Sequence, residues 1–352
     1  MTEKNDNVQG AEVTEEKQRG FALPSGINSA LIFLILAGLI IVFTALEGRS
    51  FLDVGNFLSI AVDASELLLM AVGLTFVIIT AGIDLSVGSV LVLSSVVAAK
   101  TMVALSGTPA EVQSYQFPNQ SVGIPVGIAA GLLVGLVAGV INGLLVTKLK
   151  LQPFIVTLGT LGIALGAAQI LSGGTNVPYV PTAIQSQIGT RQLLGFLPVP
   201  VLITLVVVII AVLSLSYTRF GRYTYAIGSN VEAARRVGIN VDWHLLKVYA
   251  LSGFLAGLAG IVDLARFNTA SVGAHDSDNL AAISAVVIGG TSLFGGLGTI
   301  VGSVVGTFIP AVLRNGFVQQ GVQPFWQQVA IGIVLILAVF VDQRRRSAEE
   351  RM

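Results

Sequence analysis

The chain has 352 residues, of which 54% are hydrophobic and 11% charged, and its formal net charge is zero. Soluble domains carry about 25% charged residues, so this composition excludes an ordinary soluble protein, and the zero net charge gives no indication of nucleic-acid binding. The absence of cysteine excludes disulfides and thiol catalysis, and two histidines, His244 and His275, are too few for a histidine metal site. We therefore expect an all-α polytopic membrane protein.

Ten apolar stretches meet or approach the roughly 20 residues that a membrane span needs. They cover residues 29–46, 66–82, 86–106, 123–147, 153–171, 198–216, 247–265, 279–293, 297–313 and 325–341. Several are short or glycine-rich, so eight spans with two re-entrant segments are the alternative. The 40 glycines fit close helix packing in lipid, where small residues at the contacts drive association.

Basic residues, which collect on the cytoplasmic side of membrane proteins, set the expected orientation. With the N-terminus inside, the outer segments hold only Arg49, Arg191, Arg266 and Arg314. We therefore expect both termini in the cytoplasm. Residues 1–24 are predicted to be a charged N-terminal tail and residues 343–352 a basic C-terminal tail. The transmembrane domain between them, residues 25–342, contains a cytoplasmic loop over residues 217–246.

Glycines flank Asp84 and Ser86 between the second and third predicted spans. This pattern predicts a helix break, and irregular backbone persists in a bilayer only where it is buried in protein or lines a wet cavity. Asp84, Ser86 and Gly88 are therefore candidates for the translocation pathway. The alternative is a tight turn with Asp84 as the N-cap of the third span.

A second glycine-rich break, residues 289–298, lies about 200 residues later. It makes Gly290, Thr291 and Ser292 further pathway candidates. Two such breaks in the two halves of the chain indicate an internal inverted repeat, which many transporters have. Helix packing through small residues is the alternative. Near the outer end of the seventh span, Asp263 and Arg266 are spaced to pair on one helix face.

A short polar stretch, residues 228–242, separates two long apolar runs. Ser229 followed by Glu232 has the spacing of a capping box, and Gly238 supplies a left-handed helix stop. We therefore expect one helix of about two turns over residues 230–237, with Ala233 and Ala234 keeping one side shallow. Such a helix suits a groove in another protein, whereas the alternative is a connecting loop.

The same stretch resembles the EAA loop of ABC-transporter permeases, the segment that docks on the ATPase subunit. The match consists of Glu232, Ala233 and Ala234, followed after three residues by Gly238. The resemblance implies an ATPase-coupling role for the residues of this helix and its stop, namely Glu232, Ala233, Ala234, Arg235, Arg236 and Gly238.

Four stretches together resemble the permease subunits of bacterial monosaccharide ABC importers of the ribose type. They are residues 77–89 (VIITAGIDLSVGS), 152–160 (QPFIVTLGT), 226–239 (AIGSNVEAARRVGI) and 282–299 (AISAVVIGGTSLFGGLGT). Their order and the hydropathy match over about residues 25–343. The two tails and the loop 107–121 lie outside the resemblance.

The resemblance implies a subunit that moves a ribose-like or related sugar across the bacterial inner membrane. It implies a second permease copy or paralogue, a periplasmic sugar-binding protein, and an ATPase subunit that carries ATP and Mg. It implies no catalytic site, metal or cofactor in this chain, and the sequence contains no phosphate-binding loop.

An ATP-independent secondary carrier or channel for a small polar solute is the alternative. A carrier normally buries ionisable residues in mid-span to couple an ion, whereas Asp63, Glu66 and Asp84 fall at predicted span ends. This placement favours the importer. A membrane enzyme is a third class, and the sequence offers no constellation for it.

Overall fold

The computed structural model describes residues 25–275 and 277–323, together with Phe325, Trp326, Val329, Gly332, Ile333, Ile336 and Phe340. Both predicted tails lie outside the described residues, as does most of the tenth predicted span.

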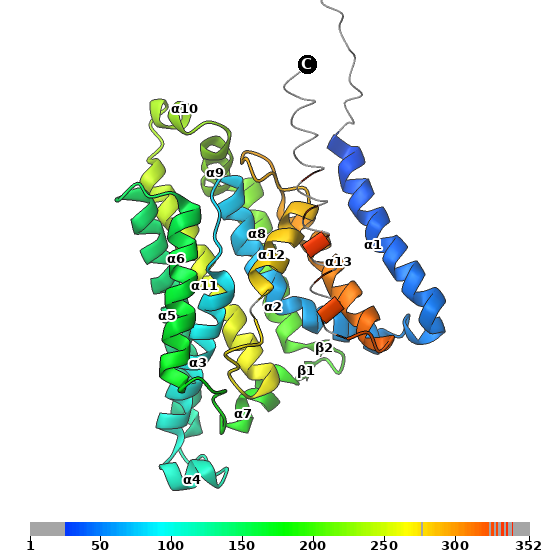
Figure 1. The fold of residues 1–352 in the computed structure, drawn as a ribbon, viewed down its shortest axis with the longest axis vertical. Helices are drawn as coiled ribbons and strands as arrows, with labels where there is room; N and C mark the ends of the chain where they lie inside the picture. The colour runs from blue at the N-terminus through cyan, green and yellow to red at the C-terminus, as the bar shows by residue number, and fades with distance from the viewer. Residues whose placement is uncertain are drawn as a thin grey trace, which may run out of the picture.

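The described chain is almost entirely helical, with one two-stranded hairpin (Figure 1). The long helices are α1 (Ser25–Glu47), α2 (Val54–Ile79), α3 (Val87–Ser106), α5 (Gln120–Thr147), α6 (Pro153–Ser172), α8 (Val199–Tyr217), α11 (Val241–Phe267) and α13 (Ile300–Gln319). The shorter elements are η1 (Gly48–Ser50), α4 (Pro109–Gln113), α7 (Thr182–Ile184), η2 (Gln185–Gly189), β1 (Gln192–Leu193), β2 (Leu197–Pro198), α9 (Arg219–Ser229), α10 (Val231–Arg236) and α12 (Asp278–Ile288).

Eight of the described helices are long and apolar enough to cross a membrane, which confirms the predicted all-α polytopic membrane protein. The eighth predicted span, 279–293, is wrong as a full span. Its helix, α12, has only 11 residues, because Gly289 ends it and Gly290 then takes a positive φ of 87°. A helix of this length rises about 16 Å, roughly half of the apolar bilayer core.

Helix α2 begins 12 residues earlier than the predicted span 66–82. Asp53 caps its start, with Oδ2 accepting a 2.8 Å hydrogen bond from the amide of Gly55. The first half of α2 was not predicted, because Asp63 and Glu66 interrupt the apolar pattern of the sequence there. Glu66 therefore lies inside a membrane-length helix, which corrects its expected position at a span end.

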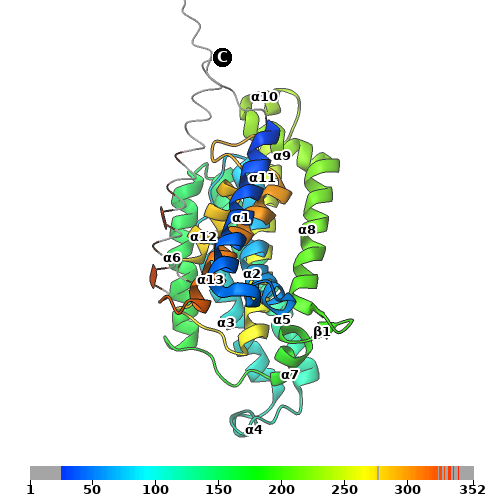
Figure 2. The ribbon, with the colours of Figure 1, turned by 90° about the vertical axis from the view of Figure 1, so that its right-hand side faces the viewer.

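Helices α2, α3 and α11 form the centre of the molecule, and the largest core cluster joins them to α12. Helix α1 is the most exposed of the long helices and packs mainly against α13 at one edge (Figure 1). Helices α6 and α8 stand on opposite sides of this centre (Figure 2).

A row of glycines on α5 permits very close packing against its neighbours. Six buried glycines recur at every fourth position from residue 123 to residue 143. A Cβ at Gly135 would overlap the carbonyl oxygen of Gly253 on α11, and one at Gly127 would lie 2.8 Å from the carbonyl oxygen of Ala98 on α3. Small residues therefore bring α5 into backbone contact with two central helices, as is common in membranes.

The two ends of the bundle carry different elements. Helix α10, the end of α9 and the start of α1 lie at one end, whereas α4, α7 and the β1–β2 hairpin lie at the other (Figure 1). We call these the α10 end and the α4 end. The predicted inverted repeat and the cytoplasmic position of the termini remain predictions.

Candidate functional site

The two predicted breaks are irregular backbone in the structure and contact each other at the α10 end. The first covers residues 80–86 between α2 and α3, and the second covers residues 289–299 between α12 and α13. The amide of Gly296 donates a 2.9 Å hydrogen bond to the carbonyl oxygen of Ile79. Two segments far apart in the sequence therefore form one structural unit.

Asp84 and Ser86 are enclosed in a polar network inside the helix bundle. Oδ1 of Asp84 accepts hydrogen bonds from the amide and hydroxyl of Ser86, at 3.0 and 2.6 Å, and Oδ2 accepts one of 2.9 Å from Ser252 on α11. Asn142 on α5 donates to the Ser86 hydroxyl at 2.9 Å and accepts from Thr160 on α6 at 2.6 Å. This network joins the first break to three helices, and Ser86 rather than Asp84 is the residue immediately before α3.

Gly88 borders a cavity of about 190 Å³ that His275 and Asn279 also line. A Cβ at Gly88 would lie 3.3 Å from the carbonyl oxygen of His275, so glycine keeps this contact close. Thr291 and Ser292, by contrast, are buried in the second break at the α10 end, and Gly290 faces α1. The six pathway candidates thus occupy three different surroundings.

The short helix in the polar stretch exists, but its cap differs from the prediction. Asn230 is the N-cap, and its Oδ1 accepts a 2.9 Å hydrogen bond from the amide of Ala233. Ser229 belongs to α9 and donates to the carbonyl oxygen of Tyr225, so the predicted Ser229–Glu232 capping box is wrong. Gly238 has a φ of +86°, which confirms the left-handed stop.

The two alanines of α10 face opposite ways, which corrects the predicted shallow side. Ala234 is buried against Ile227 of α9 and Val241 of α11. Ala233 is exposed, together with the charged residues of the helix, Glu232, Arg235 and Arg236. Arg235 forms a 3.3 Å ion pair with Asp242.

Helix α9, which was not predicted from the sequence, connects α10 to the bundle. A Cβ at Gly221 would overlap the carbonyl oxygen of Leu215 at the end of α8, and one at Gly228 would overlap that of Ile79 at the end of α2. The buried positions Gly221, Thr224 and Ile227 recur every three residues, a signal of an amphipathic helix that the sequence does contain.

Polar contacts complete the attachment of α9. The hydroxyl of Thr224 lies 2.9 Å from Nε2 of His244 on α11. The hydroxyl of Tyr225 donates a 2.6 Å hydrogen bond to the carbonyl oxygen of Gly298 in the second break. Helix α9 therefore contacts α2, α8, α11 and residues 289–299 at once.

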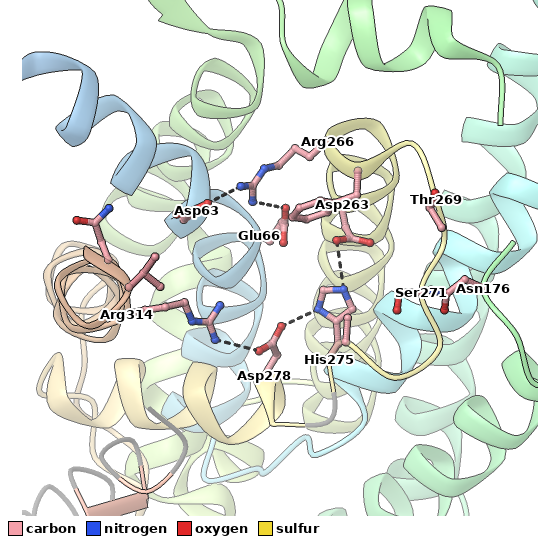
Figure 3. A pocket seen from close by; sticks show the side chains of 14 residues that line it. Asp63, Glu66, Asn176, Asp263, Arg266, Thr269, Ser271, His275, Asp278 and Arg314 are labelled. Carbon is pink, nitrogen blue, oxygen red and sulfur yellow. Dashed lines mark hydrogen bonds and ion pairs between the residues drawn. The ribbon is translucent and has the colours of Figure 1, made fainter. Parts of the chain in front are cut away.

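A charged pocket of about 500 Å³ lies toward the α4 end, between α2, α11, α13 and the loop after α11 (Figure 3). We call it the outer pocket, because the orientation predicted from the basic residues puts this end outside. Its charged lining residues are Asp63, Glu66, Asp263, Arg266, His275, Asp278 and Arg314. The sequence predicted that Asp263 and Arg266 lie together, but it did not predict the contribution of α2 and α13, because only folding brings those segments to the end of α11.

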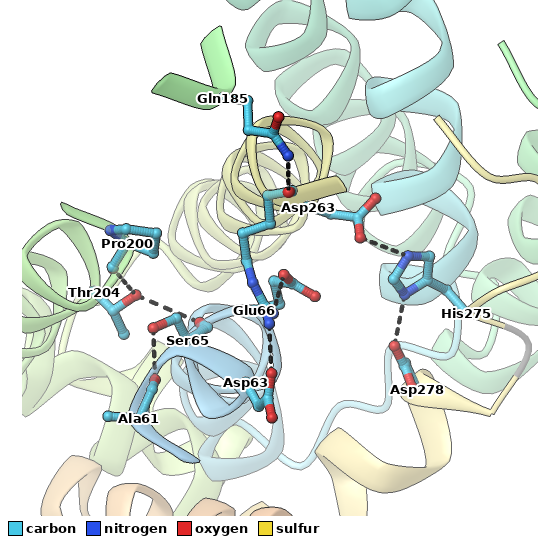
Figure 4. Close-up of polar contacts among 11 residues, drawn as sticks. Ala61, Asp63, Ser65, Glu66, Gln185, Pro200, Thr204, Asp263, His275 and Asp278 are labelled. Carbon is cyan, nitrogen blue, oxygen red and sulfur yellow. Dashed lines mark hydrogen bonds and ion pairs between the residues drawn. The ribbon is translucent and has the colours of Figure 1, made fainter. Parts of the chain in front are cut away.

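The ion pairs in the outer pocket differ from the expected Asp263–Arg266 pair. Arg266 donates to Glu66, at 2.6 Å between Nη1 and Oε1, and also pairs with Asp63 (Figure 3). Asp263 instead lies 3.2 Å from Nε2 of His275, whose Nδ1 is 2.7 Å from Asp278 (Figure 4). Arg266 lies at the end of α11 and extends toward α2. Asp263 is therefore free of Arg266 and pairs with His275.

His275 is held in its charged form by these two carboxylates. Burial lowers the pKa of the imidazole, but the hydrogen bonds and negative charges of Asp263 and Asp278 outweigh burial and raise the pKa to about 10. Glu66, Asp263 and His275 have ligand atoms within 4.8 Å of one another, a grouping with the spacing of a metal site. Both imidazole nitrogens already face carboxylates and Glu66 already accepts from Arg266, so the arrangement fits an ion-pair network better.

Comparisons with known proteins give a consistent result over nearly the whole chain. The chain is 37% identical to the ribose import permease protein RbsC of Bacillus subtilis (strain 168), over 94% of this chain and 97% of that protein. It is 37% identical to the D-allose transport system permease protein AlsC of Escherichia coli (strain K12), over 95% and 96%. It is 34% identical to the fructose import permease protein FrcC of Rhizobium meliloti, over 93% and 88%.

No solved structure matches the chain. The family model described as the permease component of a branched-chain amino acid transport system matches residues 56–339. This match covers well over half of the chain and most of its long helices. The chain therefore belongs to this family of multi-pass membrane permease components.

Proposed function

We propose that this chain is the membrane-spanning subunit of an ABC importer that moves a monosaccharide across the bacterial inner membrane. The observation that carries the proposal is the similarity of 34–37% identity, along almost the full chain, to permeases named for ribose, allose and fructose. The family description, by contrast, names branched-chain amino acids. The relatives that align from end to end favour a sugar.

The α10 end supplies a surface suited to a partner ATPase. Glu232, Ala233, Arg235 and Arg236 are exposed there. Apolar side chains are exposed beside them, including Val237 at 76% and Trp243 at 55%. Exposed apolar residues with a polar rim are typical of protein contact sites. The ATPase would carry ATP and Mg, and this chain itself would need no cofactor.

The contacts of α9 give a route by which movement at α10 reaches the bundle. Ala234 packs on Ile227, Gly228 fits against the last carbonyl of α2, and Tyr225 holds Gly298. Displacing α10 would therefore displace the end of α2 and the second break together. In this proposal Asp84 and Ser86 fix the first break against α5, α6 and α11, and Gly88 borders the pathway.

Sugar uptake by the purified complex tests this proposal. The chain is reconstituted in liposomes with its partner ATPase and sugar-binding protein, and uptake of labelled ribose, allose, fructose and leucine is measured with and without internal ATP. We expect ATP-dependent uptake of at least one sugar and none of leucine. Uptake of leucine alone, or of no sugar by an ATPase-active complex, would contradict the proposal.

The outer pocket favours a secondary carrier as the second candidate. Glu66 and Asp263 are buried ionisable residues within membrane-length helices, and such residues commonly couple ion movement to transport. The same liposomes separate the two functions. Uptake driven by an ion gradient without ATPase or ATP would establish a carrier.

A further inference from the structure

We propose that the outer pocket binds a neutral polyhydroxylated ligand, a monosaccharide, so that this chain itself contacts the sugar. The inference rests on the proposed function and adds a place where the substrate is received. The cavity of about 500 Å³ lies within the roughly 300–1,000 Å³ range of small-molecule sites. It lies toward the α4 end, opposite the surface proposed for the ATPase.

The charge balance of the pocket suits a neutral ligand. Four carboxyl side chains face two guanidinium groups and the protonated His275, so the acidic and basic groups nearly balance. Each cation already lies on at least one carboxylate. A cation or an anion would have to displace an existing partner, and separating a buried ion pair is unfavourable.

The hydroxyl groups of a ligand can instead bind to the donors and acceptors of these side chains that the ion pairs do not use. A carboxylate accepts several hydrogen bonds and a guanidinium donates several, whereas a hydroxyl does both. Arg314 is the most open partner, because its side chain is 45% exposed and its Nη2 lies 3.6 Å from Asp278. A sugar hydroxyl placed between these two groups would form two charge-assisted hydrogen bonds, each roughly twice as strong as a neutral one.

An aromatic side chain completes the site on the open side of the pocket. Phe267 lines the cavity and is 59% exposed, and the guanidinium of Arg266 lies 5.0 Å from the centre of its ring. The ring therefore offers an apolar surface directly beside the charged groups. Small-molecule sites combine such surfaces with a few fixed polar groups, and a sugar presents both C–H faces and hydroxyls.

His275 connects this site with the interior of the bundle. It lines the outer pocket and also the cavity of about 190 Å³ bordered by Gly88. The two cavities thus share one residue in their walls. A sugar in the outer pocket would therefore lie beside the cavity that Gly88 borders.

Direct binding to the full transporter tests the site. The permease–ATPase complex is placed in lipid nanodiscs without the sugar-binding protein, and equilibrium binding of the sugar that the complete system transports is measured by isothermal titration calorimetry. We expect saturable binding to the unmodified complex. Phe267→Leu and Arg314→Gln should each raise the dissociation constant of the sugar about tenfold. For Arg314→Gln this is the change expected from losing one hydrogen bond to a charged group, and we expect a loss of similar size when the Phe267 ring no longer covers the sugar.

Two matched variants on the same side of the molecule serve as controls. Phe196→Leu removes an exposed ring from the hairpin turn, and Arg49→Gln removes an exposed guanidinium, and neither residue lines the pocket. Both should bind the sugar as the unmodified complex does. No saturable binding by a complex that does transport the sugar, or equal binding by all four variants, would overturn the site but leave the importer intact. Saturable binding of Ca²⁺ or Mg²⁺ that requires Asp263, with no sugar binding, would also overturn it.

Discussion

The backbones of Gly228 and Ile79 pack so closely that no side chain fits between them. A Cβ at Gly228 would overlap the carbonyl oxygen of Ile79 and lie 2.6 Å from the amide nitrogen of Gly296, which donates to that same carbonyl. The end of α9, the end of α2 and the second break therefore meet at one point. We therefore expect movement at the α10 end to reach α2 and the second break through this contact.

Gly228→Ala should therefore impair transport more than a methyl group ordinarily does. Overpacking of this kind costs about 1–3 kcal/mol, and relief requires α9 to move away from α2. We expect ATP-driven uptake to fall about fivefold or more at equal membrane levels. Gly159→Ala on α6 is the matched control, because a Cβ there meets nothing within 4 Å. Equal uptake by the two variants would show that the contact is not needed.

The two alanines of α10 should respond differently to the same substitution. Ala234→Asp places a charge in the buried contact with α9 and α11, where an unpaired charge costs several kcal/mol, so we expect the melting temperature to fall. Ala233→Asp lies on the exposed face and should leave melting unchanged while weakening co-purification of the ATPase. If Ala233→Asp retains full ATPase binding, the exposed face of α10 is not the docking surface.

The sequence predicted the parts of the fold that depend on local composition. Apolar length identified the eight described long helices, and glycine marked both breaks and the stop at Gly238. It failed where a polar residue is buried by distant partners. Glu66 interrupted an apolar window, although Arg266, 200 residues away, compensates its charge inside the fold.

The candidate sites show the same division. The short helix α10 and its stop at Gly238 could be predicted because both are local features, although the cap is Asn230 rather than Ser229. The contacts of α9 could not be predicted, since Gly221 and Gly228 acquire their meaning only from the carbonyl groups opposite them. The outer pocket is likewise assembled from α2, α11, α12 and α13, and no spacing in the sequence relates those segments.

Arg266 should be among the residues whose loss most affects stability. Arg266→Gln leaves Glu66 buried without its cation, and removing one partner of a buried pair costs about 3–5 kcal/mol. We expect a marked drop in the melting temperature of the purified complex. The double variant Glu66→Gln/Arg266→Gln should recover much of the loss, because two amides can pair with each other. A double variant less stable than Arg266→Gln alone would contradict this reading.

Cysteine labelling tests the orientation of the two ends without interference, because the chain has no native cysteine. Leu194 is 86% exposed in the hairpin at the α4 end, and Glu232 lies at the α10 end. In intact cells, an impermeant maleimide should label Leu194→Cys and spare Glu232→Cys until the membrane is permeabilised. Labelling of Glu232→Cys from outside would reverse the orientation and remove α10 from reach of a cytoplasmic ATPase.

The stability of the transporter should depend on pH through His275, in the loop after α11. Its pKa rises from an ordinary 6.5 to about 10 despite burial, because Asp263 of α11 and Asp278 of α12 face its two nitrogens. A raised pKa means that protonated His275 stabilises the folded state. This contribution is fully present below pH 6.5 and is lost as the pH rises toward 10.

Between these limits the unfolded chain binds fewer protons than the folded one, so stability falls by on the order of 1 kcal/mol per pH unit. Glu66 and Arg314 also face this cluster, and Arg314 keeps its charge throughout the window. We expect the melting temperature of the nanodisc complex to decrease steadily from pH 7 to pH 9. His275→Gln should be less stable at pH 7 and show a flatter profile, and parallel profiles for the two proteins would exclude His275 as the source.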